Sequence, residues 1–488
     1  MDRSYLSNPF SLTKREFENK SLLDNSMSLN YAYFYYNDET KYATFEKNGI
    51  TLILIGYILD IRDSSQTSAS ITESLLDLYF KKNNLFYENL SYLNGRFVLI
   101  FDSEDDTLVY SDSTALRPLF YWENDIVSSH EIIIREAVLE ELNIELEISS
   151  FEMKNFLDYS NTDSIYKFNP NLYFSFKDQE FIRYYPKDNF ENQTLEKVLE
   201  NTENYFLPQV EWLDKNYSTI QQSLTGGFDA RLSLAINKPI LDKLNFFTYM
   251  YRFNENDLYD ELSQFKKIYY KDKYIVDQLI YNFNLRHKYF FFGDYKMPRE
   301  YQEKISTHVS SHHSYILSYL THEEFDKGSI HVKSTLYELA KQPYTGHAEM
   351  KIEDNWMIRA IKHWAPAEIR EDESILNDMY QAYFRRNKLQ EVINKGHNLP
   401  MIIYWEYRMG NWHGSLTQET DTVMETFIFI NNRYMIDQLL TLKLEDKKEK
   451  RYLTELVKRF WPALNYFVSN SFDTLEDKLE ETKKHIKN

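Results

Sequence analysis

The sequence predicts an α/β protein in two parts, and three features of the chain support this. Residues 31–120 contain short apolar or β-branched runs separated by polar turns, which is typical of strands. From residue 194 onward, strand-like runs alternate with helical patterns, as in a parallel sheet covered by helices. Residues 350–488 have mostly helical periodicity. We therefore expect a strand-rich α+β half followed by an α/β half with a helical C-terminal part.

The first half contains several runs with strand character. They lie at 31–36, 50–58, 96–102 and 107–112, with a further hairpin at 172–184. Residues 70–90 have helical spacing instead, and Ser70 with Glu73 fits a capping box at the start of that helix.

The second half begins with a predicted helix at 194–214. A short strand follows and ends near Leu224, and the next helix begins directly after it. Buried strands are expected at 244–251 and 285–292, with a helix between them. The polar segment 185–193 breaks the pattern between the halves. A chain of 488 residues suits two or three domains, so we expect domains at 1–190 and 191–488.

Composition excludes several classes of function. The net charge is −19, and anionic surfaces repel phosphate backbones, so no nucleic-acid partner is expected. The chain has no cysteine, which excludes disulfides, thiolate nucleophiles and cysteine-bound metals. Neither a signal peptide nor an apolar run of about 18 residues is found, so no membrane association is expected. The expected location is the cytoplasm.

A candidate phosphate loop lies in the stretch YSTIQQSLTGGFDARLSLA. Gly226 and Gly227 follow the predicted strand and let the backbone turn sharply and approach a ligand. The helix that follows directs its free N–H groups and positive dipole end at the turn, which suits a polyphosphate. Thr225 can donate its hydroxyl to phosphate, and Asp229 can hold Mg²⁺. The alternative is a strand–helix turn that needs glycine only for tight packing.

The loop resembles a family motif. LTGGFDAR is similar to the S-G-G-x-D-S pyrophosphatase loop of asparagine synthetases, β-lactam synthetases and lasso-peptide cyclases, with Ala230 in place of the last serine. FFTYMY is similar to the second strand of that family, whose end contacts adenine through backbone atoms. The resemblance implies that ATP is bound by Leu224, Thr225, Gly226, Gly227, Phe228, Asp229, Ala230, Arg231 and Tyr249.

A second segment resembles the same family in the same order along the chain. YLNGRFVLIFDSEDDTLVYSDSTALRPLFYW is similar to a segment of its N-terminal glutaminase domain, with matches at Gly95, Phe97, Asp102, Asp112, Pro118, Leu119 and Tyr121. The implied fold of this half is an Ntn-type αββα sandwich. The cysteine nucleophile that follows the initiator methionine in the family is replaced by Asp2, and the stretch that grips glutamine corresponds to Ile55–Tyr57. We therefore expect no glutamine hydrolysis.

Three weaker resemblances concern the rest of the implied synthetase site. VKSTLYELAKQPYTG matches a metal-binding segment loosely, with Glu338 as a second Mg²⁺ ligand and Tyr344 at the family's tyrosine. ETFIFINNR places Glu425 at the family's glutamate, a candidate base if its pKa is raised. The family's catalytic lysine corresponds to Asn470. Another cation could take its place, and the candidates are Arg433, Arg451 and Lys333.

The resemblance implies an ATP- and Mg²⁺-dependent ligase that forms amide bonds. Such an enzyme adenylates a substrate carboxylate, releases pyrophosphate and lets an amine attack the activated acyl group. The carboxylate could belong to a small molecule, a peptide or a sugar, and a homodimer is one candidate assembly. The alternative is a pseudoenzyme that binds nucleotide and partners a biosynthetic enzyme, which the changes at Ala230 and Asn470 favour.

Overall fold

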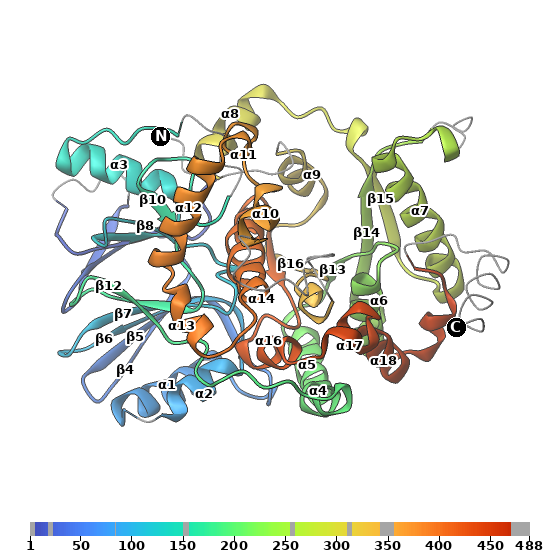
Figure 1. Ribbon diagram of the computed structural model, residues 1–488, viewed down its shortest axis with the longest axis horizontal. Coiled ribbons are helices and arrows are strands. Elements are labelled where there is room, and N and C mark those ends of the chain that lie inside the picture. The colour runs from blue at the N-terminus through green and yellow to red at the C-terminus, as the bar shows by residue number, and fades with distance from the viewer. Residues whose placement is uncertain are drawn as a thin grey trace.

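The computed structural model describes residues 5–17, 23–82, 84–149, 156–253, 259–309, 315–341 and 356–469. Within these ranges the first half of the chain forms two antiparallel sheets and the second half forms one parallel sheet. Figure 1 shows the antiparallel sheets at one end of the molecule and the parallel sheet toward the other, with helices of the C-terminal third between them. The predicted fold class is confirmed.

The two antiparallel sheets have six strands each. The order in the first is β10 (Ile165–Lys167), β8 (Phe120–Trp122), β9 (Ile126–Ser128), β1 (Phe10–Thr13), β3 (Tyr33–Tyr36) and β2 (Asn25–Ser28). The order in the second is β12 (Glu180–Arg183), β11 (Leu172–Ser175), β7 (Thr107–Ser111), β6 (Leu93–Asp102), β5 (Ile50–Asp60) and β4 (Tyr42–Lys47).

The antiparallel sheets pack face to face around one apolar core. Fully buried side chains of both sheets form it, including Phe10, Phe34, Ile53, Val98 and Phe174. Helices α1 (Ser68–Phe80) and α2 (Leu85–Ser91) cover the outer face of the second sheet, and α3 (Glu131–Leu142) packs on β8 and β9 of the first. The layers therefore follow the predicted αββα order.

The parallel sheet has five strands. Their order is β15 (His287–Phe291), β14 (Leu244–Met250), β13 (Ile220–Ser223), β16 (Ser329–Val332) and β17 (Met424–Phe427). The chain starts at the central β13, adds strands to one side and then crosses to the other side with β16. Ligands of such sheets bind where the order reverses, at the carboxyl ends of the strands. In this chain that point lies between β13 and β16.

Helices and short helical turns make up most of the remaining chain. The α-helices of the second half that precede β16 are α4 (Leu195–Thr202), α5 (Phe206–Asn216), α6 (Phe228–Ile236), α7 (Gln264–Phe283), α8 (Arg299–His308) and α9 (Ile316–Glu324), of which α8 packs against α3 of the sandwich. The C-terminal helices are α10 (Trp356–Lys362), α11 (Ala367–Glu371), α12 (Glu373–Arg386), α13 (Leu389–Asn394), α14 (Leu399–Ile403), the π-helix η7 (Tyr404–Trp412), α15 (His413–Gln418), α16 (Arg433–Leu440), α17 (Leu444–Lys448) and α18 (Arg451–Phe460). The 3₁₀ turns are η1 (Glu203–Tyr205), η2 (Lys238–Lys243), η3 (Tyr259–Glu261), η4 (Phe292–Asp294), η5 (Tyr337–Ala340) and η8 (Pro462–Tyr466).

Two predicted helices differ from the observed ones. The helix expected at 70–90 is two helices, α1 and α2, and the cap residue is Thr67, which exchanges hydrogen bonds with Ser70. The helix expected at 194–214 is interrupted by η1. No helix in the described ranges is both long and apolar enough to cross a bilayer.

The two halves pack closely against each other. The Asn94 amide donates to the carbonyls of Ile428 (2.9 Å) and Phe429 (3.1 Å), just beyond β17. A Cβ added at Gly414 of α15 would lie 2.7 Å from the carbonyl oxygen of Ala115, so only glycine allows this approach. The helical part of the second half is therefore fixed on the αββα sandwich. The division into domains at 1–190 and 191–488 remains a prediction.

Candidate active site

The predicted phosphate loop follows β13 at the carboxyl edge of the parallel sheet. The N–H of Leu224 donates to the carbonyl of Phe247 (2.9 Å), and its own carbonyl accepts from Thr248 Oγ1 (2.5 Å). The next two residues make the turn, and Gly227 is the N-cap of α6. The loop therefore lies beside the switch point between β13 and β16.

Gly226 is required for close packing against α7. Its N–H donates to Asp272 Oδ1 (2.9 Å), and an added Cβ would lie 2.8 Å from Ile275 Cδ1. Burial raises the pKa of Asp272. Tight packing, the alternative explanation of the glycine pair, thus accounts for Gly226. The case for a ligand depends on the rest of the loop and on the space beside it.

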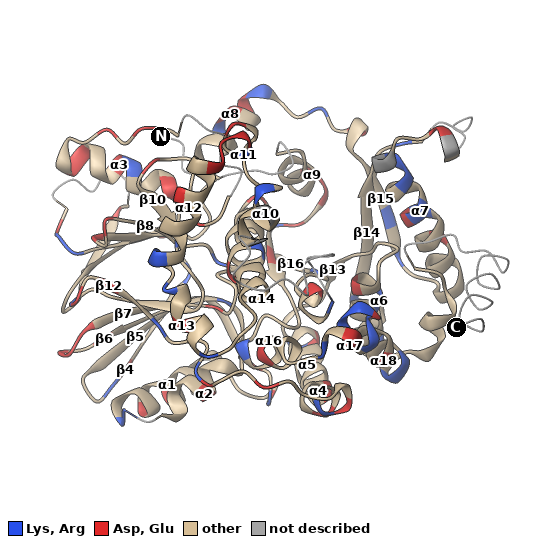
Figure 2. Cartoon of the chain, viewed as in Figure 1, with Lys and Arg blue, Asp and Glu red and all other residues tan. Residues whose placement is uncertain are grey.

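The start of α6 combines backbone donors and nearby lysines with the carboxylate of Asp229. Helix geometry leaves the N–H groups of Phe228, Asp229 and Ala230 without intrahelical acceptors, and the positive end of the helix dipole adds to them. Lys341 Nζ donates to Asp229 Oδ2 (2.6 Å), and Lys450 Nζ lies 4.9 Å from the centre of the Phe228 ring. Figure 2 shows further basic residues on α17 and α18, and α18 packs on α6. This end of α6 can attract an anion although the net charge is −19.

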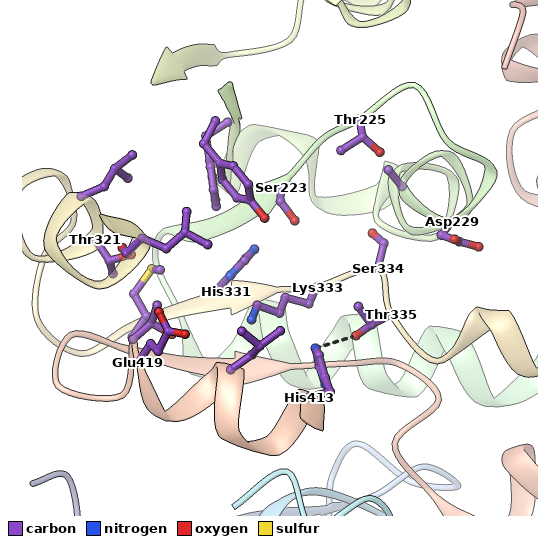
Figure 3. A pocket seen from close by; sticks show the side chains of 18 of the residues that line it. Ser223, Thr225, Asp229, Thr321, His331, Lys333, Ser334, Thr335, His413 and Glu419 are labelled. Carbon is purple, nitrogen blue, oxygen red and sulfur yellow. Dashed lines mark hydrogen bonds between the residues drawn. The ribbon is translucent and has the colours of Figure 1, made fainter. Parts of the chain in front are cut away.

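A cavity of about 290 Å³ adjoins the loop on one face of the parallel sheet. The sheet supplies its floor, with Ser223, Phe247, Tyr249, His331, Lys333 and Met424. The opposite wall comes from α9, from the end of η7 and from α15 and the turn after it, with Leu317, Leu320, Thr321, Trp412, His413, Leu416, Glu419 and Thr420. The rim consists of Thr225, Gly227, Asp229, Ala230, Ser334 and Thr335. Figure 3 shows Thr225 and Asp229 at one end of the cavity and Thr321 and Glu419 at the other, with His331 and Lys333 between them.

The two predicted metal ligands are close enough to influence each other. Burial raises the pKa of Glu338 to about 7, and the negative charge of Asp229 adds to this effect. Burial also raises the pKa of Asp229, against the opposing effect of Lys341. Asp229 Oδ1 and Glu338 Oε2 are both buried without a hydrogen-bond partner in the described part of the chain. Buried carboxylate oxygens left in this state suit a hard divalent cation, so these residues fit Mg²⁺.

Lys333 is the cationic side chain at the centre of the cavity. It follows β16 directly, and its N–H donates to the carbonyl of Phe427 (2.9 Å). Burial lowers the pKa of Lys333 to about 8, with Arg96 acting in the same direction and Glu419 opposing it. The group therefore remains mostly protonated at neutral pH. Of the three cations suggested for the role of the missing family lysine, Lys333 is the one that lines the cavity.

The other two suggested cations are engaged elsewhere. Arg433 donates to backbone carbonyls of the first half, at Ser111, Asp112 and Pro170. Arg451 is half exposed and pairs with Glu449 and Asp446. Asn470 lies outside the described residues.

One further residue of the predicted site is placed differently from the prediction, and another is not among the described residues. Arg231 does not face the cavity, because its guanidinium donates to the carbonyls of Phe467 (2.6 Å) and Val468 (2.5 Å). Its expected contact with nucleotide is therefore not supported. Tyr344 lies outside the described residues.

Glu425 does not have the setting expected of a base. It is paired across β16 and β17 with Ile330, whereas the cavity-facing His331 is paired with Thr426. Successive side chains of a strand point to opposite faces, so Glu425 lies on the face away from the cavity. Arg117 (2.8 Å) and Arg96 (3.1 Å) bind its carboxylate. Burial opposes ionisation, but the two arginines outweigh it and lower the pKa of Glu425, the opposite of what the base role needs.

The same cluster occupies the region matched to the family's glutamine-gripping stretch. Gly56 has a φ of +96°, and an added Cβ would lie 2.1 Å from the Arg96 carbonyl oxygen and 2.8 Å from Arg117 Nε. The Tyr57 hydroxyl donates to the carbonyl of Thr426 (2.6 Å). These residues therefore join the first half to β17 and leave no room for a side chain at Gly56.

His331 and Glu419, two residues of the cavity, escaped the sequence analysis, whereas Lys333 was among its candidate cations. His331 and Lys333 alternate with the apolar Ile330 and Val332, and such alternation in a central parallel strand indicates a polar face. This signal was present in the sequence. Glu419 gave no comparable signal, because its place in the cavity depends on how α15 packs over the sheet.

Comparisons with known proteins do not assign a family. No family model matches the chain, and no curated protein matches its sequence. Among solved structures, one described as the allosteric regulatory enzyme of purine biosynthesis shares 10% sequence identity at a TM-score of 0.24, with 75% of this chain and 74% of that chain covered. Glutamine phosphoribosylpyrophosphate amidotransferase from B. subtilis, complexed with ADP and GMP, shares 9% identity at a TM-score of 0.22, with 75% of both chains covered. Similarities this weak carry no argument about function, and the resemblance to asparagine synthetases remains a prediction.

Proposed function

We propose that this protein is an ATP- and Mg²⁺-dependent ligase that activates a carboxylate as an acyl-adenylate and joins it to an amine. The observation that carries the proposal is the position of the loop. The start of α6 lies beside a cavity at the switch point of the parallel sheet, and Asp229 is one of the residues that line it. A strand–helix turn that served packing alone would not need a cavity with polar groups beside the turn.

Each residue has a role that follows from its position. The free N–H groups of α6 and the hydroxyl of Thr225 would hold phosphate oxygens. Asp229 and Glu338 would hold Mg²⁺, which neutralises charge on the phosphates when it is bound. Lys333 would stabilise the negative charge that develops as pyrophosphate leaves. Glu425 has no part in this scheme, and the sandwich serves as a structural support rather than a glutaminase.

The reaction is tested by pyrophosphate release. Purified protein is incubated with ATP, Mg²⁺ and a panel of carboxylates that includes amino acids, short peptides and sugar acids, with hydroxylamine as a small nucleophile. We expect at least one carboxylate to give equal amounts of pyrophosphate, AMP and hydroxamate. Release of ADP and phosphate would contradict the proposal. ATP would then be cleaved between its β- and γ-phosphates and not at its α-phosphate.

A second candidate function is nucleotide binding without chemistry. The observation that favours it is the engagement of Glu425 by Arg96 and Arg117, which leaves the proposed reaction without the base expected from the family resemblance. Tight ATP binding without pyrophosphate release across the whole panel would support this role instead.

A further inference from the structure

The end of the cavity farthest from the phosphate loop has its own chemical character. Leu317 and Leu320 are on α9 together with Thr321, which Figure 3 places at this end, and the other apolar residues of the lining are Phe247, Leu416 and Met424. Glu419 is the one acidic residue at this end among the described residues, and only 1% of it is exposed. A carboxylate in apolar surroundings interacts strongly with a cation, because little water screens the charge.

Two buried histidines indicate that the cavity accommodates a ligand. His331 Nε2 and His413 Nδ1 are buried and have no hydrogen-bond partner in the described part of the chain. Both side chains line the cavity. Burial lowers the pKa of each imidazole well below its usual value, so both are neutral at pH 7 and can still donate or accept a hydrogen bond. Buried polar atoms without partners are rare in folded proteins, and a ligand would satisfy them.

The charges along the cavity are ordered. Figure 3 shows Lys333 between the loop end, where Thr225 and Asp229 lie, and the opposite end, where Glu419 lies. The free N–H groups of α6, together with Lys341 and Lys450, favour the anionic part of a ligand at the loop end. Glu419 favours a cationic part at the far end. A ligand that spans the cavity, or two ligands that meet at Lys333, would therefore be oriented with phosphate at one end and a cation at the other.

We propose that the far end of the cavity is the subsite for the amine substrate, and that this substrate is a primary aliphatic amine that arrives as an ammonium ion held by Glu419. Glu419 accepts one proton from it, the neutral nitrogen then forms a bond to the acyl carbon, and the bond from that carbon to AMP breaks. This inference rests on the proposed ligase function, because it assigns the second substrate of that reaction. The apolar side chains accommodate the alkyl part. An anionic second substrate is disfavoured by the charge of Glu419, and a neutral one gains no electrostatic attraction from it.

The subsite can be tested without knowing the carboxylate substrate. n-Butylamine is the probe, with n-butanol and butyrate as neutral and anionic analogues of similar size. Their binding to the full-length protein is measured at pH 7 by ligand-observed NMR titration. We expect butylammonium to bind at least about tenfold more tightly than butanol or butyrate. Glu419→Gln should abolish this preference, and Glu419→Asp should retain part of it.

A matched control is Glu323→Gln, since Glu323 is an exposed carboxylate near the end of α9. It should leave the preference for butylammonium unchanged. Stronger binding of butyrate than of butylammonium to the wild-type protein would overturn the inference, because Glu419 would then serve only to balance Lys333. Equal binding of all three probes would also overturn it.

ATP binding measured on the same preparations separates the two proposals. If the protein binds ATP with Mg²⁺ but shows no preference for butylammonium, the amine subsite is refuted and the proposed function stands. If it prefers butylammonium through Glu419 but binds no ATP, the cationic subsite is supported and the ligase function is refuted.

Discussion

Replacing Lys333 by methionine should lower the rate of pyrophosphate release by roughly 100-fold or more. A positioned cation that stabilises developing negative charge in a partly dry site is typically worth a factor of about 10²–10³ in rate. Methionine keeps a similar length and removes the charge, so the loss reports the ammonium group and not the volume of the side chain. The measurement is the steady-state rate with saturating ATP and the active carboxylate.

The pH dependence of the same reaction provides an independent test of Lys333. Its pKa is lowered to about 8, so the ammonium form is present below that pH and is lost as the pH rises through it. The wild-type rate should therefore fall between pH 7 and 9, and Lys333→Met should be insensitive over this range. Lys327→Met is the control, because Lys327 is exposed just before β16 and should behave like the wild type. A wild-type rate that rises through pH 8 would contradict the role.

Replacing Arg96 by methionine should destabilise the protein by about 3–5 kcal/mol, the range measured when one partner of a buried ion pair is removed. Arg96 is fully buried, donates to both carboxylate oxygens of Asp421 (2.5 and 2.6 Å), and also contacts Glu425 (3.1 Å). Its loss would leave the carboxylates of Asp421 and Glu425 between the two halves without this partner, while Arg117 would still bind Glu425. The urea midpoint, followed by near-UV circular dichroism, measures the effect.

The control for Arg96 is an exposed ion pair of the same chemistry. Arg252 is 62% exposed and pairs with the half-exposed Asp294 at 2.6 Å. Arg252→Met should change the stability by less than about 1 kcal/mol, because water and salt screen exposed pairs. Similar urea midpoints for the two variants would show that the stability of the protein does not depend on the buried cluster of Arg96, Asp421 and Glu425.

The sequence was sufficient to locate the loop and part of the strands, whereas others, such as β16 and β17, were not predicted. Apolar runs with turn residues between them identify β5, β6 and β7, and a glycine pair between a strand and a helix identifies the turn before α6. These features are local, so periodicity and turn chemistry carry them. Interruptions such as η1 were missed, because helical spacing continues across a short 3₁₀ turn that tertiary packing imposes.

The cavity could be predicted only in part, because a cavity depends on register and on distant packing. A motif match put Glu425 in the site, but the pairing of β17 with β16 directs that side chain to the opposite face. A shift of one residue along a strand reverses the face of every side chain, and no motif match resolves that. Glu419 reaches the cavity only through the packing of α15 over the sheet, which the sequence does not specify locally.

The central claim is that the turn before α6 binds ATP with Mg²⁺, and isothermal titration with a non-hydrolysable ATP analogue tests it most directly. The wild-type protein should bind the analogue in the presence of Mg²⁺ and at least about tenfold more weakly when Mg²⁺ is removed. Asp229→Asn should lose this Mg²⁺ dependence, and Asp242→Asn, at an exposed carboxylate of η2, should keep it. No binding by the wild type, or equal affinity and Mg²⁺ dependence in Asp229→Asn, would contradict the account.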